Sequence, residues 1–270
     1  MNNSKNRQLI IVPHPKRSEK DLTISDNGKE EKFTIFFDGF RRSTDKNEDP
    51  FIWNDNFLYT FCHGNEVFTK SLINNFSKAN TDKDDIFLVF VSPTIFNDAK
   101  HFAIDTIIKI KKLVKLPNDR SKASLKKALN NTNFKEDTIT NILTYHFPGS
   151  KGKEFIEHNR KNLYIAVGDA EESFLPMVAS ESKNSNYYPF IFDKTSSSQI
   201  KKIIQANSGS SHGYYVAKKS SNRFTKYKCC KLKEKFEAIR KQIINNVIDN
   251  NKIYKLKGNQ IKNEMDKLRK

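Results

Sequence analysis

The segment that most constrains the fold is the run IFLVFV at residues 86–91, in which six consecutive residues are apolar. A strand that is apolar on both faces is typical of the centre of a parallel sheet that is covered on both sides. Further strand-like runs occur at 33–37, 163–167 and 189–192. Helix-like segments separate them, and strands that alternate with helices need crossover connections. The sequence therefore predicts an α/β fold, a mostly parallel sheet flanked by helices.

The clearest helical pattern follows directly after this central run. Ala103, Ile107, Ile110 and Val114 recur at steps of four, three and four residues, and Asn97 stands where an N-cap is expected. We therefore expect one helix over about 97–114. Other helical segments are expected within 55–79 and at 120–131, 136–146 and 197–206.

Three parts are expected along the chain. Residues 1–31 are polar and rich in turn-forming residues, which predicts a flexible N-terminal tail. Residues 32–227 form the α/β domain, and 228–270 form a basic C-terminal helical segment. This segment is amphipathic, and packing on the domain is favoured over lying on a membrane or pairing with a partner. Its apolar stripe consists of Phe236, Ile239, Ile243 and Val247.

The chain is strongly basic, with 48 Lys and Arg against 31 Asp and Glu and a formal net charge of +17. Such a charge attracts the phosphates of nucleic acid or of anionic lipid. The aromatic and basic residues interleaved at 222–233 suit base stacking and phosphate contact, although a half-buried strand with lysines at its surface explains them equally well. Nucleic acid and an anionic membrane surface are the expected classes of partner.

Cysteine usage indicates a reducing compartment. The three cysteines are an odd number, and the adjacent pair Cys229 and Cys230 does not readily form a disulfide. No CxxC pair and no His pair at ligand spacing accompanies them, so we expect no metal and no cofactor. The apolar stretch at residues 9–12 is too short for a signal peptide or a membrane span. A cytoplasmic protein is expected, unless a dedicated secretion system delivers it.

Three polar residues lie where the strands and loops of an α/β sheet usually place a catalytic site. Ser92 and Asp169 follow predicted strands, and His212 lies in a later loop. The order Ser, Asp, His is that of α/β-hydrolases, in which the serine attacks an ester, the histidine takes its proton and the aspartate orients the imidazole. Glu171 and Glu172 are alternatives to Asp169 for the third role.

Four segments resemble signatures of the α/β-hydrolase-like domain shared by type VI secretion phospholipase effectors and their uncharacterised relatives. The resemblance implies cleavage of lipid acyl esters, with Ser92 as nucleophile, Asp169 as orienting group and His212 as base. It also implies that Asp38 and Gly39 lie beside the site on the first-strand loop. The segments, in chain order, are KFTIFFDGFRRSTDKNEDP, DDIFLVFVSPTIFNDAKHFA, NLYIAVGDAEESFLPM and SHGYYVAKKSSNRF.

The nucleophile segment departs from the family pattern. Phe90 and Thr94 occupy the positions of the two glycines that flank the nucleophile in a strained elbow. Pro93 has no backbone N–H, which removes an oxyanion-hole donor worth about 10² to 10³ in rate. We therefore expect a diverged hydrolase that acts weakly or no longer acts. The alternative is a non-catalytic basic protein that binds nucleic acid or an anionic membrane.

Overall fold

The computed structural model describes a framework of two β-sheets and several helices. The described residues are 6–13, 19–26, 29–36, 51–53, 56–60, 84–115, 117, 122–130, 132, 134–141, 164–180, 188–206, 215–216, 237–258 and 260.

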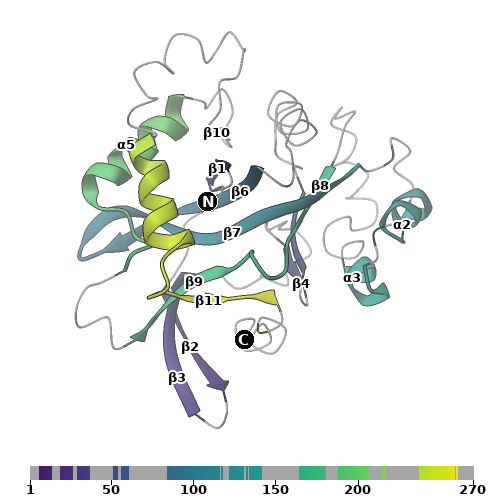
Figure 1. Cartoon of the computed structure of the whole chain (residues 1–270), viewed down its shortest axis with the longest axis horizontal. Helices are drawn as coiled ribbons and strands as arrows, with labels where there is room; N and C mark the ends of the chain where they lie inside the picture. The colour runs from purple at the N-terminus through teal and green to yellow at the C-terminus, as the bar shows by residue number, and fades with distance from the viewer. Residues whose placement is uncertain are drawn as a thin grey trace, which may run out of the picture.

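The larger sheet has seven strands in the order β10-β1-β6-β7-β8-β5-β4 (Figure 1). Within it β1 and β6 run parallel, and all other neighbours are antiparallel. The strands in this order are β10 (Tyr215–Val216), β1 (Asn6–Pro13), β6 (Asp84–Phe96), β7 (Ala99–Lys115), β8 (Tyr164–Gly168), β5 (Asn56–Thr60) and β4 (Phe51–Trp53).

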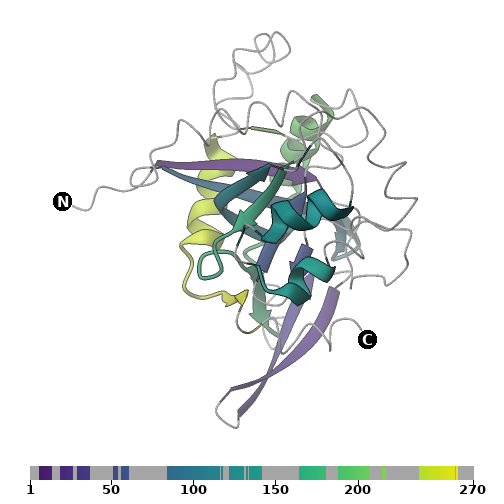
Figure 2. The same cartoon turned by 90° about the vertical axis from the view of Figure 1, so that its right-hand side faces the viewer.

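The smaller sheet has four antiparallel strands in the order β11-β9-β3-β2. They are β11 (Tyr254–Leu256), β9 (Leu175–Ala179), β3 (Lys29–Phe36) and β2 (Glu19–Asp26). The β2–β3 hairpin extends away from the rest of the framework in both views (Figures 1 and 2). These strands pack against one face of the larger sheet, and the core between the two sheets includes Leu22, Ile35 and Met177.

Helices cover the opposite face of the larger sheet. Helix α5 (Lys194–Ala206) and the helical segment 237–248, whose last turn is the π-helix η4 (Ile244–Ile248), share a second core with β1, β6 and β7. Helices α2 (Lys122–Asn130) and α3 (Glu136–Asn141) pack over β5 and β8. The framework therefore has three layers: helices, a mixed sheet and an antiparallel sheet.

Strand β1 shows why these residues form a central strand. Leu9 and Ile11 point into the core beneath the helices, whereas Ile10 and Val12 point into the core between the sheets. Successive side chains on a strand face opposite sides, so a run that is apolar throughout buries both faces at once. The same alternation divides residues 86–91 of β6, all of which are at most 3% exposed.

The predicted α/β-hydrolase-like fold with a mostly parallel sheet is wrong. Strand accounts for 54% of the described residues and helix for 28%, so sheet rather than helix dominates the framework. The smaller sheet is antiparallel throughout, and the larger sheet has a single parallel pair. An apolar central run is compatible with either strand direction, because it reports burial on two faces and not the path of the connection.

The helix predicted over 97–114 is also wrong, because these residues form a hairpin turn and strand β7. Asn97 and Asp98 have φ values of 47° and 58°, and Phe96 pairs with Ala99. Two consecutive residues with positive φ are typical of the type I′ turn that joins two antiparallel strands. The helical spacing was coincidental, because β7 is buried on both faces and has apolar residues at odd and even positions.

Three other expectations differ from the structure. The tail expected over residues 1–31 contains β1 and β2. Residues 56–60, expected to be helical, form β5, and the rest of that segment up to residue 79 lies outside the described residues. The strand expected at 189–192 is a turn with one bridge, from Ile191 to Ala103.

Several predictions are confirmed. The strands expected at 33–37, 86–91 and 163–167 correspond to β3, β6 and β8. The helices expected at 120–131, 136–146 and 197–206 correspond to α2, α3 and α5 over their described residues. The amphipathic segment packs on the sheets through its stripe, since Ile239, Ile243 and Val247 are buried, whereas Phe236 lies outside the described residues.

Candidate functional site

Ser92, the predicted nucleophile, lies inside β6 and not at a strand-to-helix elbow. It pairs with Ala103 of β7, and the strand continues to Phe96 before it turns. Its side chain is fully buried, and its Oγ has no hydrogen-bond partner among the residues that the structure describes. A nucleophile must reach its substrate, so this placement does not suit attack on a lipid ester.

Asp169 lies in the turn between β8 and β9. Its Oδ1 accepts hydrogen bonds from the backbone N–H groups of Glu171 at 2.9 Å and Glu172 at 3.2 Å. A carboxylate that caps the following amides in this way is typical of a turn. Lys111 Nζ lies 4.0 Å from Oδ2. Asp169 therefore stabilises the turn.

The structure separates these two predicted site residues. Ser92 pairs with Ala103, whereas the N–H of Asp169 donates to the carbonyl of Lys109, six residues further along β7. Six residues of strand span roughly 20 Å. His212, Asp38 and Gly39 lie outside the described residues, so the triad as a whole stays a prediction.

Glu172, one alternative to Asp169, belongs to a charge cluster around Lys109. Lys109 Nζ donates to Glu172 and lies 3.0 Å from Asp85 Oδ1, and the Lys109 and Asp85 side chains are almost buried. Burial lowers the pKa of Lys109, but hydrogen bonds and charge attraction from Glu172 and Asp85 outweigh it, so the pKa lies above 10.5. This cluster ties the turn of residues 169–172 to β6 and β7.

Lysines are frequent at the end of β7, on helix α2 and directly before α3. We call this the lysine surface; it consists of Lys111, Lys112, Lys115, Lys126, Lys127 and Lys135. Five of the six side chains are exposed, and Lys112 is half-buried. Figure 2 shows α2 and α3 side by side on the face of the molecule turned to the viewer.

Local contacts hold this surface in place. Lys112 Nζ donates to the carbonyl of Thr132 at 2.8 Å and lies 5.8 Å from the centroid of the Phe134 ring, which links β7 to the chain between the two helices. Lys126 Nζ pairs with Glu136 at 2.6 Å, which joins α2 to α3. Beneath them, apolar side chains of both helices pack on β5 and β8. The exposed lysines thus stand on packed elements.

The lysine surface accounts for the positive charge of the described framework. The described residues have 21 Lys and Arg against 17 Asp and Glu, a net charge of +4. Those between positions 111 and 141 have seven Lys and two acidic residues, a net charge of +5, so the rest of the described part is at −1. The other +13 of the chain lies outside the described residues.

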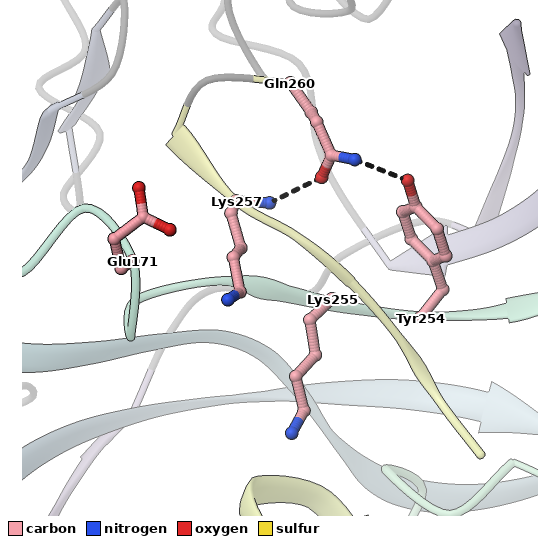
Figure 3. Close-up of a pocket in the computed structure, with 5 residues that line it drawn as sticks. All are labelled: Glu171, Tyr254, Lys255, Lys257 and Gln260. Atoms are coloured by element: carbon pink, nitrogen blue, oxygen red, sulfur yellow. Dashed lines mark hydrogen bonds between the residues drawn. The ribbon is translucent and has the colours of Figure 1, made fainter. Parts of the chain in front are cut away.

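A second feature is a hollow of about 460 Å³ beside β11. Its lining consists of Glu171, Tyr254, Lys255, Lys257 and Gln260 (Figure 3). Gln260 is fixed at both ends of its amide: Nε2 donates to Tyr254 Oη at 2.7 Å, and Oε1 accepts from the Lys257 backbone N–H at 3.4 Å. Polar groups from two segments far apart in the chain therefore converge on this hollow.

No protein-family model, curated protein or solved structure matches this chain. Among the residues that the structure describes, no cluster of three or more His, Cys, Asp and Glu side chains is arranged to hold a metal ion. Within the same residues, none of the helices is both long enough and apolar enough to cross a membrane.

The sequence contained part of the signal for the lysine surface. All seven charged residues at 109–115 and 122–127 are lysines, a bias that the helix prediction at 97–114 obscured. The hollow was missed because Glu171 lies 83 residues before Tyr254, and only the β9–β11 pairing brings the two segments together.

Proposed function

We propose that the protein binds nucleic acid without catalysis, through phosphate contacts to the lysine surface. The observation that carries this proposal is the separation of charge: +5 on the described residues between 111 and 141, and −1 on the rest of the described framework. Lysines that neutralise phosphates release condensed counterions, which drives binding without regard to base sequence. A clustered surface on packed elements suits this role better than scattered charge.

The exposed side chains favour contact with the phosphate backbone over base readout. The aromatic residue of this region, Phe134, is half-buried and lies beneath Lys112. The described surface therefore presents ammonium groups rather than stacking rings, and stacking rings are what base contacts in single strands usually need. We expect binding with little sequence preference.

An anionic membrane is the less suitable partner. A helix that inserts at a membrane surface needs an exposed apolar face. The apolar residues Leu125, Leu129 and Ile139 of α2 and α3 are buried against the sheet. Among the described residues, the one large hydrophobic side chain with high exposure is Ile95, on the β6–β7 hairpin and not on the lysine surface.

The test compares two charge-reversal variants of the full chain. The first, Lys115→Glu/Lys127→Glu/Lys135→Glu, changes exposed residues of the lysine surface. The second, Lys194→Glu/Lys201→Glu/Lys202→Glu, makes the same change of net charge on exposed residues of α5, on the other side of the molecule (Figure 1). Binding of fluorescent single-stranded and duplex oligonucleotides is measured by anisotropy over about 50 to 200 mM salt.

We expect the lysine-surface variant to bind about 10- to 100-fold more weakly and its salt slope to fall by about 2.7, because each lost phosphate contact removes about 0.9. The α5 variant should stay close to wild type. Equal losses in both variants would show that only net charge matters and would overturn the assignment of the surface. Binding to anionic vesicles without binding to either oligonucleotide would overturn the choice of partner.

A further inference from the structure

The hollow beside β11 is separate from the lysine surface and has its own electrostatic character. Of its lining residues, Lys255 and Lys257 are cations and Glu171 is an anion. Lys255 lies in the edge strand β11, and Lys257 follows directly after this strand. Residues two apart along a strand share a face, and Figure 3 shows both side chains extending in the same direction. Glu171 approaches from the turn between β8 and β9. The hollow thus has one more positive than negative group.

Asp249, the anion that acts on Lys255, is already paired with Arg7. Asp249 is held by Arg7, whose NH1 lies 2.6 Å from Oδ1 and 2.5 Å from Oδ2. Lys255 Nζ instead donates to the carbonyl of Ile248 and lies 5.2 Å from the centroid of the Phe174 ring, both uncharged partners. Within the described part of the chain, the half-buried Lys257 ammonium forms no ion pair.

The environment of Lys255 shows that an anion would be favourable there. Burial lowers the pKa of Lys255; Asp249 opposes this effect, whereas the positive charges of Lys257 and Arg7 add to it. A bound anion would offset those positive charges and stabilise the protonated ammonium. Figure 3 shows the Gln260 amide and the Tyr254 ring on the other side of β11 from the two ammonium groups, and a few polar groups around one hollow are typical of a small-molecule site. The ring of Tyr254 is held by Phe33, with centroids 4.5 Å apart.

The volume of the hollow and the carboxylate of Glu171 define the class of ligand. A volume of about 460 Å³ falls in the range of sites that take small organic molecules, and exceeds what an inorganic ion needs. Glu171 repels a second negative centre but accepts hydrogen bonds from hydroxyl groups. We propose that the hollow binds a phosphate monoester of a hydroxylated molecule, a sugar phosphate or a mononucleotide, with its phosphate between Lys255 and Lys257.

The test is calorimetric titration of the full chain with ribose 5-phosphate, adenosine monophosphate, inorganic phosphate and ribose. The two phosphate esters should bind more tightly than inorganic phosphate, and ribose should not bind. Lys257→Met should weaken ester binding about 10- to 100-fold, the range expected when one charged hydrogen bond is lost. Lys252→Met, on an exposed residue of the same segment that does not line the hollow, is the matched control.

Two further measurements make the result specific to this site. Titrations in buffers of different ionisation enthalpy at alkaline pH should reveal proton uptake by wild type that is absent in Lys255→Met. Lys257→Met should bind oligonucleotides like wild type, so failure of this proposal is distinguishable from failure of the proposed function. No binding of either ester at millimolar concentration, or ester binding that Lys257→Met leaves unchanged, would overturn the proposal. A preference for one ester identifies which of the two is the ligand.

Discussion

Gly168→Ala should destabilise the protein, although the same change in most strands stabilises it. Gly168 is the last residue of β8 and is buried. A Cβ at this position would lie 2.7 Å from Ser173 Oγ, 2.8 Å from Ile108 Cγ2 and 2.8 Å from Phe57 Cβ. The Cβ of Phe57 is attached to the backbone of the neighbouring strand, so it cannot move aside without moving that strand.

The expected loss in the free energy of unfolding is the difference between two opposing effects. Replacing a strand glycine by alanine normally gains about 0.5–1 kcal/mol in backbone entropy. Overpacking a filled core costs about 1–3 kcal/mol, and three contacts this short place the cost at the upper end. The expected net loss is about 2 kcal/mol in the free energy of unfolding. In a protein of this size that lowers Tm by about 4–8 °C.

Thermal and urea unfolding followed by circular dichroism measure this loss. A double-mutant cycle with Ser173→Ala, which removes the nearest atom, serves as the control. The cost of Gly168→Ala should be smaller by at least about 0.5 kcal/mol in the Ser173→Ala background. Unchanged or increased stability of the single variant would refute the packing described around β8.

Two other substitutions test the charge cluster and the docked helix. Lys109→Met should cost about 3–5 kcal/mol at neutral pH, because it removes one partner of the buried ion pair between Lys109 and Asp85; urea unfolding with a loss below about 1 kcal/mol would contradict this. Because the folded pKa of Lys109 is raised, its stabilisation is present below 10.5 and is lost as pH rises through the folded pKa, so the alkaline decline in Tm should be shallower in the variant. Ile243→Ala should cost about 2–5 kcal/mol, whereas the exposed Lys241→Ala should change stability by less than about 0.5 kcal/mol; equal effects in thermal unfolding would argue against docking of the segment 237–248.

The parts of the fold that were predictable are those in which local pattern and tertiary contact agree. The run at residues 86–91 had to be buried on both faces, whatever the direction of its neighbours. The stripe of Ile239, Ile243 and Val247 had to cover an apolar surface, and it covers the sheet. In each case one segment contained the whole signal.

The predicted fold class is wrong because the fold class depends on how the strands pair, which no single segment of the sequence shows. Residues 103–114 have apolar side chains at both helical and strand spacing, and their β-branched residues and the preceding Asn97-Asp98 favour a hairpin only when weighed together. The sequence predicts a tail in place of β1 because four apolar residues do not show, by themselves, that β6 and β10 lie on either side of them. Because β6 is followed by a hairpin turn and β7 instead of a helix, there is no strand-to-helix elbow at Ser92.

The candidate sites depended on tertiary structure in the same way. Net charge was visible in the sequence, but its concentration on the lysine surface required β7 to be a strand whose Lys112 contacts the chain between α2 and α3. The hollow required the pairing of β11 with β9. Neither arrangement is encoded within one window of residues, so neither was open to pattern analysis.

Arg7 of β1 forms side-chain and main-chain contacts with the segment 237–249, which lies far from it in the sequence. Asp249 pairs with the Arg7 side chain, and the Arg240 guanidinium donates to the Arg7 carbonyl at 3.0 Å and 2.7 Å. During synthesis, β1 must therefore wait for more than 230 further residues before this contact can form. Contacts so distant in sequence slow folding and leave apolar strands uncovered in the meantime. In a nascent chain, the face of β6 and β7 that the segment 237–248 covers thus stays exposed until this segment has left the ribosome.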